Sequence, residues 1–200
     1  MKNILIINNN PNNDSGIYTP ILINNIKNNH KVYECRNIKD VNNLINQKIN
    51  INLIITCGSS INLMKDVNIS EHINKTTLAI LTFPEVPIVG ICFGMQLLCL
   101  LYGCSLYEKK RLKPDFEELY KIKESKLFEN ISDKFDGYCT NNIFCDFTNV
   151  NNLDILVKDK NNNIMSFKHK YKEIYGIQFH GEIQKKDVEM NQIIQNILEL

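Results

Sequence analysis

One short segment combines a reactive side chain with the backbone features that a nucleophile needs. Gly90-Ile91-Cys92-Phe93-Gly94 follows an apolar run and precedes a helical one, which is the spacing of a nucleophile elbow. At such a strand-to-helix turn the helix N-terminus favours negative charge on a thiol. The N–H of the following residue, Phe93, can stabilise an oxyanion on an attacked carbonyl group. These five residues alone are equally compatible with a structural cysteine.

A thiol nucleophile needs a general base, and the sequence contains four histidines. His180 ends the apolar run 175–179, so it is expected at the carboxyl edge of a sheet, where open α/β folds place their sites. Glu182 can accept a hydrogen bond from the other imidazole nitrogen and orient the ring. A strand-end histidine alone is more often structural, but its combination with Cys92 favours catalysis. The others, which are expected in polar, loop-like segments, are His30, His72 and His169.

The elements that position these residues follow from hydrophobic spacing. Short β-branched runs at 4–7, 53–56 and 88–92 predict buried parallel strands. Between them, helical spacing predicts helices at 21–26 and 41–49, the second capped by Asp40. Alternating strands and helices indicate a right-handed α/β fold.

The second half of the chain indicates added β structure. Short alternating runs predict further strands, and a last strand is followed by a helix with one apolar stripe. We find no internal repeat or linker, so residues 1–200 are expected to form a single domain. The strands are predicted at 119–122, 143–147, 155–157, 164–167 and 174–179, and the helix at 190–198.

Composition excludes several classes of protein. The 23 Lys and Arg against 22 Asp and Glu give a net charge of +1, which argues against a nucleic-acid binder or a protein of anionic membranes. The seven cysteines form no C-x-x-C pair, so neither a disulfide framework nor a metal site is expected. The first apolar run is too short for a signal peptide or membrane span, and we expect a cytoplasmic protein. The asparagine runs at 8–10 and 161–163 are interpreted as solvated loops.

Two blocks, Gly90 to Gln96 and Gly176 to Glu182, together resemble the class I glutamine amidotransferases in order and spacing. Within that family the likeness is greatest to the glutamine-hydrolysing part of GMP synthases, whose intervening segments resemble 124–131 with 134–135, and 165–170 leading to 174–176. The resemblance implies a flavodoxin-like fold, in which helices flank an open, mostly parallel sheet in three layers. The predicted β-rich segment adds to it.

The resemblance also implies a role for each matching residue. Cys92 attacks the side-chain amide of L-glutamine, His180 transfers the proton, Glu182 orients His180, and ammonia leaves from a thioester. The loop 56–60 stands where the family has its second oxyanion donor, which makes Gly58 the partner of Phe93. The residues expected to bind the substrate are Gln96, Thr140 and Asn141.

Several positions depart from the family pattern. Met95 replaces a common histidine, Gly181 replaces the usual proline, and Thr140-Asn141-Asn142 replaces a Ser-His or similar pair. Glycine frees a backbone that proline fixes, and an amide cannot become cationic. The loop 56–60 also lacks the usual paired glycines and proline. These changes predict weak or tightly gated glutaminase activity in the isolated chain.

The chain carries neither a Ser-Gly-Gly-x-Asp-Ser phosphate loop nor a G-x-x-x-x-G-K-[ST] motif. The resemblance therefore implies no cofactor and no ATP-pyrophosphatase domain in this chain. ATP and Mg²⁺ would act on a separate GMP synthetase subunit, which would use the ammonia to convert xanthosine monophosphate to GMP. The lysine-rich segment 108–114 lies where the family contacts its partner, although such a run is commonly a solvated face.

Two other functions remain open. A stand-alone γ-glutamyl or glutamine hydrolase would use the same triad at full activity without a synthetase. A non-catalytic binding module would retain the fold, and its Cys92 would not react with a glutamine-analogue electrophile.

Overall fold

Parallel strands form the half of the central sheet that carries the predicted elbow. The computed structural model describes residues 1–11, 16–66, 69–109, 113–183 and 189–200. Its main sheet has nine strands in the order β2-β1-β3-β4-β11-β10-β9-β6-β7, and the first five are mutually parallel. These five strands are β2 (Lys31–Cys35), β1 (Asn3–Ile7), β3 (Leu53–Thr56), β4 (Ile88–Ile91) and β11 (Ile174–Ile177).

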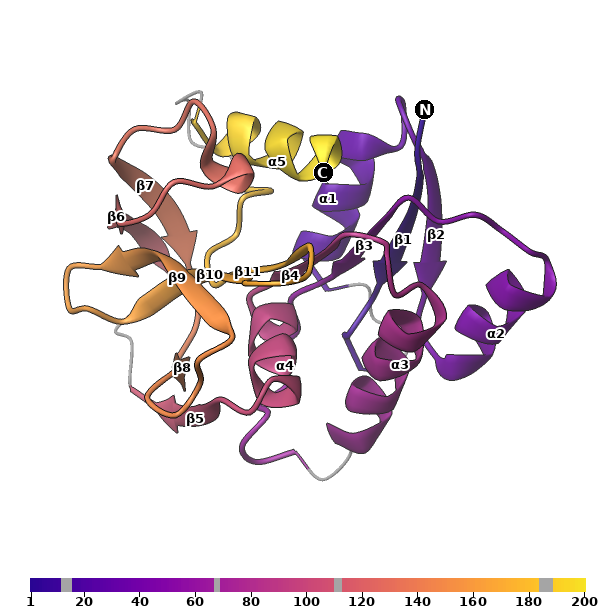
Figure 1. Ribbon diagram of the computed structural model, residues 1–200, viewed down its shortest axis with the longest axis horizontal. Helices are drawn as coiled ribbons and strands as arrows, with labels where there is room; N and C mark the ends of the chain where they lie inside the picture. Colours follow the sequence, from indigo (N-terminus) through magenta and orange to yellow (C-terminus); the bar gives the residue numbers. More distant parts are fainter. Residues whose placement is uncertain (12–15, 67–68, 110–112, 184–188) are drawn as a thin grey trace.

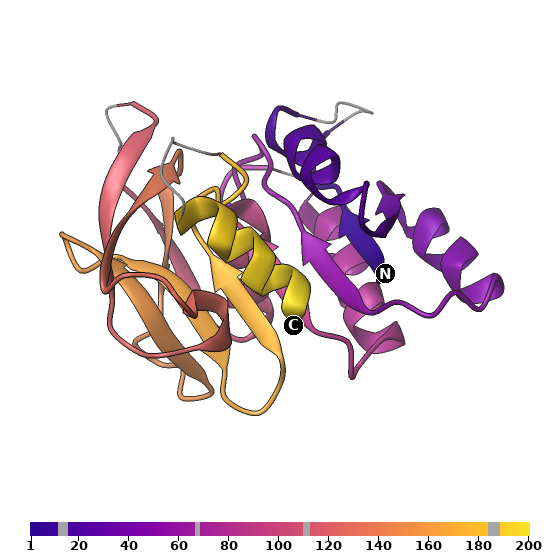
Figure 2. The same cartoon turned by 90° about the horizontal axis from the view of Figure 1, so that it is seen from above.

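The β-rich half extends the same sheet with antiparallel strands. Figure 2 shows these strands beside the parallel half. Two further strands pair separately as a small ribbon. The extension consists of β10 (Ile164–His169), β9 (Leu153–Asp159), β6 (Asp115–Lys121) and β7 (Lys134–Cys139). The ribbon consists of β5 (Ser105–Glu108) and β8 (Ile143–Asp146). A 3₁₀ turn, η1, spans Lys126–Phe128.

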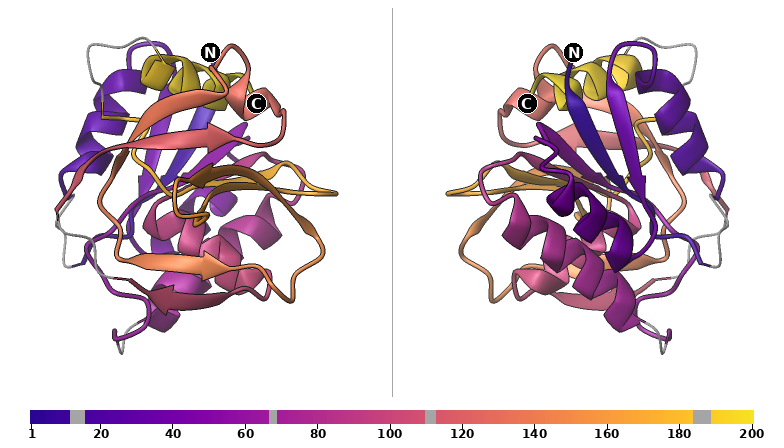
Figure 3. Two further views of the ribbon diagram at one scale, coloured as in Figure 1. Left: turned by 90° about the vertical axis from the view of Figure 1, so that its left-hand side faces the viewer. Right: turned by 90° about the vertical axis from the view of Figure 1, so that its right-hand side faces the viewer.

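Helices cover both faces of the sheet (Figures 1 and 3). Because side chains alternate along a strand, Ile4 and Ile6 pack with the helices on one face, whereas Leu5 and Ile7 pack with those on the other. Each such buried side chain stabilises the fold by about 1.5–3 kcal/mol. One face carries α1 (Tyr18–Ile26) and α5 (Glu189–Glu199), and the other α2 (Ile38–Asn46), α3 (Ile69–Thr82) and α4 (Phe93–Leu101).

This architecture confirms the predicted fold class: an open α/β sheet with a parallel centre, flanked by helices and extended by β structure. Five elements were not predicted, namely β2, α3, β5, η1 and β7. The predicted cap of α2 was also wrong, because Asn37 is the N-cap and Asp40 completes a capping box from the third helical position. Among the described residues, none of the helices is long and apolar enough to cross a bilayer.

Candidate active site

Cys92 lies between β4 and α4 in a backbone conformation that few side chains tolerate. Its φ is +53° and its ψ is −107°, and its N–H donates to the carbonyl of Ile177 at 2.7 Å. Since β4 and β11 are parallel neighbours in register, this bond fixes the turn against the end of β11. α4 begins at Phe93, so its first N–H groups, which have no intrahelical acceptor, lie next to the sulfur.

His180 and Glu182 form a buried pair at the end of β11. His180 Nδ1 lies 2.8 Å from Glu182 Oε1, with the two side chains 1% and 2% exposed. The His180 N–H donates to the carbonyl of Tyr138 in β7 at 2.8 Å, and the Ile183 N–H donates back to the His180 carbonyl at 3.2 Å. The turn that carries the pair is therefore tied to the β-rich extension.

The other edge of the His180 ring faces Cys92 and its neighbours. Thr140 Oγ1 lies 3.1 Å from His180 Nε2 and 4.0 Å from Cys92 Sγ, so the hydroxyl lies within reach of both groups. Gly58 is also close, because a Cβ built on it would lie 3.0 Å from His180 Cε1 and 3.6 Å from Cys92 Cβ. The structure thus brings together five of the residues singled out in the sequence: Gly58, Cys92, Thr140, His180 and Glu182.

The charge on His180 follows from its two partners. Burial of the ring lowers the pKa of His180, but the Glu182 carboxylate and negative charge on Cys92 raise it, and the net pKa is about 10. An imidazolium is therefore favoured at neutral pH. A cationic ring beside the thiol and an anionic carboxylate behind it form the electrostatic arrangement of an activated cysteine.

Cys92 and His180 open onto a cavity of about 440 Å³, within the range of small-molecule sites. Its polar lining consists of amides and hydroxyls, with His180 the only charged group in it among the described residues. The polar side chains that line it are Asn10, Tyr18, Ser59, Ser60, Asn62, Gln96, Thr140, Asn141 and Asn142.

Gln96 and Asn141 form one fixed wall of this cavity. Both side-chain amides donate to the carbonyl of Ile143, at 3.1 and 3.0 Å, and Gln96 also donates to Gln178 Oε1 at 3.2 Å. Gln178 is completely buried and was missed in the sequence, although it stands two residues before His180. The predicted substrate residues therefore line the cavity on a preformed network.

Met95, which replaces a common histidine of the family, packs in the core on the opposite face of the sheet from α1. Two histidines lie in other surroundings than predicted. His72 is buried in α3 with its ring against Phe93, at 5.5 Å between centroids, and His169 is buried in β10. Neither of these histidines therefore lies in a polar loop.

The asparagine run after β1 is also not a solvated loop. Asn8 and Asn9 are buried, and Asn9 donates to Thr56 Oγ1 at 2.8 Å and to the Cys57 carbonyl at 3.0 Å. Asn10 follows them into the lining of the cavity. In the second run, Asn163 is buried against Asp159.

Two expectations concern other parts of the molecule. Part of the lysine-rich segment, residues 110–112, lies outside the described residues, so its predicted contact with a partner stays a prediction. All seven cysteines are buried, and none of them forms a disulfide bond. Within the described ranges, His, Cys, Asp and Glu side chains form no cluster of three that could hold a metal ion.

The glycines of the elbow let α4 approach the sheet, and this leads to a first prediction. A Cβ on Gly94 would lie 2.0 Å from the Thr56 carbonyl oxygen. We expect Gly94→Ala to lower the free energy of unfolding by about 3 kcal/mol or more, because backbone must move. Urea denaturation measures this loss.

Gly103→Ala is the matched control, since Gly103 has a φ of +88° but no atom within 4 Å of a built Cβ. Gly103→Ala should lower the free energy of unfolding by only about 1–2 kcal/mol, which is the strain of placing a side chain at a positive φ. Equal losses in the two variants would contradict the close approach at Gly94.

Comparisons with protein families and with known proteins found similar sequences. The family model described as glutamine amidotransferase class-I matches residues 14–200. A glutamine-hydrolysing GMP synthase subunit of Methanocaldococcus jannaschii is 30% identical over 123 residues, which cover 61% of this chain and 64% of that protein. The corresponding subunit of Methanosphaera stadtmanae is 33% identical over 100 residues, covering 50% and 53%. The chain thus spans between half and two thirds of these relatives.

Solved structures share the fold at low sequence identity. A candidate GMP synthase subunit from Thermoplasma acidophilum superposes with a TM-score of 0.77 at 18% identity, covering 100% of this chain and 93% of that one. A glutamine amidotransferase from Thermotoga maritima gives a TM-score of 0.68 at 17% identity, covering 99% and 81%. Both agree with the sheet and helix layers described above.

Proposed function

The chain belongs to the class-I glutamine amidotransferase family, and from this premise we propose that it hydrolyses L-glutamine to glutamate and ammonia. The observation that carries the proposal is the set of contacts around one imidazole: His180 meets the carboxylate of Glu182 at Nδ1 and the Thr140 hydroxyl, next to Cys92, at Nε2. These groups open onto a cavity lined by amides and hydroxyls.

In the proposed reaction, His180 holds the proton of the Cys92 thiol, and the Cys92 sulfur attacks the carboxamide carbon of glutamine as a thiolate. The carbonyl electron pair moves to oxygen, and His180 gives its proton to the leaving nitrogen, which departs as ammonia when the C–N bond breaks. Water then attacks the thioester as His180 removes a proton from it. The C–S bond breaks, glutamate is released, and the Cys92 thiolate and the proton on His180 are restored.

The oxyanion needs hydrogen-bond donors fixed before the reaction. We propose the backbone N–H groups of Phe93 and Gly58. Phe93 is the first residue of α4, where the N–H has no intrahelical acceptor. Gly58 packs beside Cys92 and His180, and a larger residue there would press against the imidazole.

The amino-acid end of glutamine would be held by neutral groups. Gln96, Thr140 and Asn141 line the cavity, and Gln96 and Asn141 are already anchored to the Ile143 carbonyl. Anchored amides lose little entropy on binding. With no cationic side chain there among the described residues other than His180, substrate binding is expected to be weak in the isolated chain.

We further propose that residues 1–200 act as one amidotransferase domain in the cytoplasm and pass ammonia to a separate GMP synthetase subunit. The relatives named as glutamine-hydrolysing GMP synthase subunits support this partner. ATP and Mg²⁺ would be used there to activate xanthosine monophosphate, and this domain would need no cofactor. A larger residue would fit at position 181, because a Cβ on Gly181 would lie 3.5–3.8 Å from its nearest neighbours, which is ordinary van der Waals contact.

The test is glutamate release from L-glutamine by the purified chain. It should be measured alone and with the GMP synthetase partner, ATP, Mg²⁺ and xanthosine monophosphate, with Cys92→Ala as the control. We expect slow release alone and about ten-fold or greater stimulation by the loaded partner, as closure of a site commonly gives. The stimulated rate should disappear in Cys92→Ala.

Full activity without the partner would favour the stand-alone γ-glutamyl or glutamine hydrolase. No release in either condition from folded protein, together with no reaction of Cys92 with a glutamine-analogue electrophile, would favour the non-catalytic binding module.

A further inference from the structure

An aromatic ring covers one face of the proposed catalytic base. The Tyr18 ring stacks on the His180 ring, with centroids 3.9 Å apart and planes inclined by 30°. His180 is only 1% exposed, and its edges meet Glu182, Thr140 and Gly58. Tyr18 is therefore the face contact of a ring whose edges are already held.

Tyr18 is itself fixed by contacts at both ends of its side chain. Burial and the neighbouring Tyr138, to which its hydroxyl is hydrogen-bonded, raise the pKa of Tyr18 to about 12. Tyr138 also accepts the His180 N–H at its backbone carbonyl. One residue of β7 thus holds both members of the stack.

The backbone that carries Tyr18 is equally constrained. Gly16 has a φ of +62°, and a Cβ there would lie 2.6–2.8 Å from the Asn10 side chain, so the chain turns tightly before α1. Thr19, which follows Tyr18, is 1% exposed and hydrogen-bonds the Cys57 thiol. The start of α1 is thereby tied to the segments that follow β1 and β3.

From this stack we propose that Tyr18 is a positioning residue: its ring holds the His180 imidazole in place and stabilises it as an imidazolium through stacking and cation–π attraction. The proposal rests on the proposed function only for its catalytic consequence. Nothing in the sequence pattern marked Tyr18, because it follows an asparagine-rich segment outside both family blocks.

In the proposed reaction the His180 imidazole must hold a proton between the step that receives it and the step that donates it. A cation over an aromatic face is attracted by the ring quadrupole, more strongly where water is excluded. The stack also opposes rotation out of the plane that serves Glu182 and Thr140. The titratable groups facing His180 are Glu182 on its own turn, Cys92 at the start of α4 and Tyr18 on α1.

The experiment is an NMR titration of the histidine rings in ¹⁵N-histidine-labelled full chain, with His180→Asn to assign the signal. Four histidines keep the spectrum simple. In Tyr18→Leu we expect the pKa of His180 to fall by about one unit, and kcat for glutamine to fall about ten-fold. Tyr18→Phe keeps the stack. It should leave the pKa of His180 within about 0.3 units, and kcat within about two-fold, of the wild-type values.

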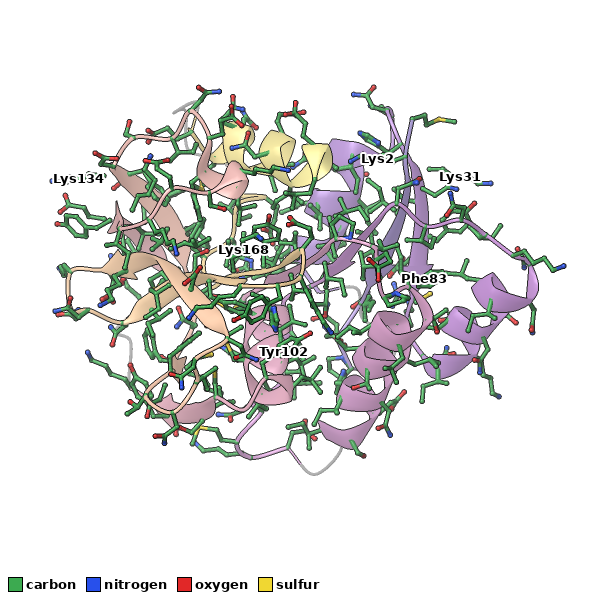
Figure 4. The ribbon with its side chains drawn as sticks, in the orientation of Figure 1. Lys2, Lys31, Phe83, Tyr102, Lys134 and Lys168 are labelled. Carbon is green, nitrogen blue, oxygen red and sulfur yellow. The ribbon has the colours of Figure 1, made fainter. Side chains whose placement is uncertain are left out.

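Tyr102→Leu is the matched control. Tyr102, labelled in Figure 4, packs on His169 with centroids 4.8 Å apart, at the end of α4 away from Cys92. The Tyr102→Leu substitution removes this second tyrosine–histidine contact and should leave the pKa of His180 unchanged.

An unchanged or raised pKa of His180 in folded Tyr18→Leu would overturn the proposal, as would an equal defect in Tyr18→Phe, which would assign the effect to the hydroxyl. Tyr18→Met gives a second non-aromatic variant if the leucine variant does not fold. The titration needs no glutamine, so it decides the role of Tyr18 even if the wild-type chain fails to hydrolyse glutamine.

Discussion

Replacement of Cys92 by either alanine or glycine is expected to abolish glutamine hydrolysis, while the two variants differ in stability. Loss of the sulfur removes the nucleophile proposed to form the thioester, so the rate should fall by at least about 10³-fold. Ammonia or glutamate release, measured with the partner present, gives the rate.

Stability separates the two variants because Cys92 has a φ of +53° and a ψ of −107°. A side chain in such a region costs of the order of 1–3 kcal/mol. Alanine keeps this strain and glycine removes it, although glycine loses about 0.5–1 kcal/mol more backbone entropy on folding. We expect Cys92→Gly to be more stable than Cys92→Ala by about 1 kcal/mol in urea denaturation.

The control for this difference is an alanine-to-glycine pair at a position without strain. Ala79 is fully buried within α3, in a helical conformation. Ala79→Gly should destabilise by about 1 kcal/mol, the opposite sign to the change at Cys92. If glycine also destabilised position 92 relative to alanine, the strain at the elbow would be disproved.

The centre of the fold could be predicted because buried parallel strands are continuous apolar runs. β1, β3, β4 and β11 each read as such a run, and each lies within one or two residues of its predicted bounds. These four strands also carry most of the site at their carboxyl ends. Cys92 and His180 could be predicted at one edge of the sheet because the two strands that precede them, β4 and β11, were predicted nearly correctly.

Elements without an apolar run could not be predicted in this way. β2 is an edge strand in the sheet order with only Cys35 fully buried. α3 places His72, Lys75 and Thr76 on its buried face. Lys75 donates to the Asn8 carbonyl at 2.6 Å and the Arg36 carbonyl at 3.0 Å, partners that only the folded chain supplies. Polar residues among the buried side chains of a helix weaken the hydrophobic pattern that would predict it.

The same limit applies to the site. The candidate residues of the two blocks could be picked out because their spacing is local: they are Cys92, Phe93 and Gln96 in the first and His180 and Glu182 in the second. Tyr18, Gln178 and Asn9 act through partners 47 to 162 positions away, such as Thr56 for Asn9 and His180 for Tyr18. Polar side chains whose partners lie on distant strands look like loop residues in the sequence. Tertiary contacts, rather than composition, decide whether an asparagine is buried.

Replacement of Glu182 by glutamine is the second change with a large expected effect. The amide oxygen can still accept from His180 Nδ1 at the 2.8 Å contact, so the ring keeps its orientation while the charge behind it is lost. We expect kcat to fall by about 10²-fold or more. The pKa of His180 should fall from about 10 towards the ordinary histidine value, as the histidine NMR titration would measure.

This change also alters how stability depends on pH. The pKa of His180 is about 10 in the folded chain and about 6.5 in the unfolded one, so the folded state binds the proton more tightly. The stabilisation is complete below about pH 6.5 and is lost as pH rises through about 10. The free energy of unfolding should therefore decrease across this window in wild type, and the slope should be much smaller in Glu182→Gln.

Glu173→Gln provides the comparison, because Glu173 pairs at 3.1 Å with Lys168, which is labelled in Figure 4. Exposed pairs contribute little, so this variant should keep the wild-type slope and the wild-type kcat. A Glu182→Gln chain with the same slope as Glu173→Gln would show that Glu182 does not hold the proton on His180. The imidazolium would then have to be stabilised by Cys92 and Tyr18 alone, and the role of Glu182 would be reduced to packing.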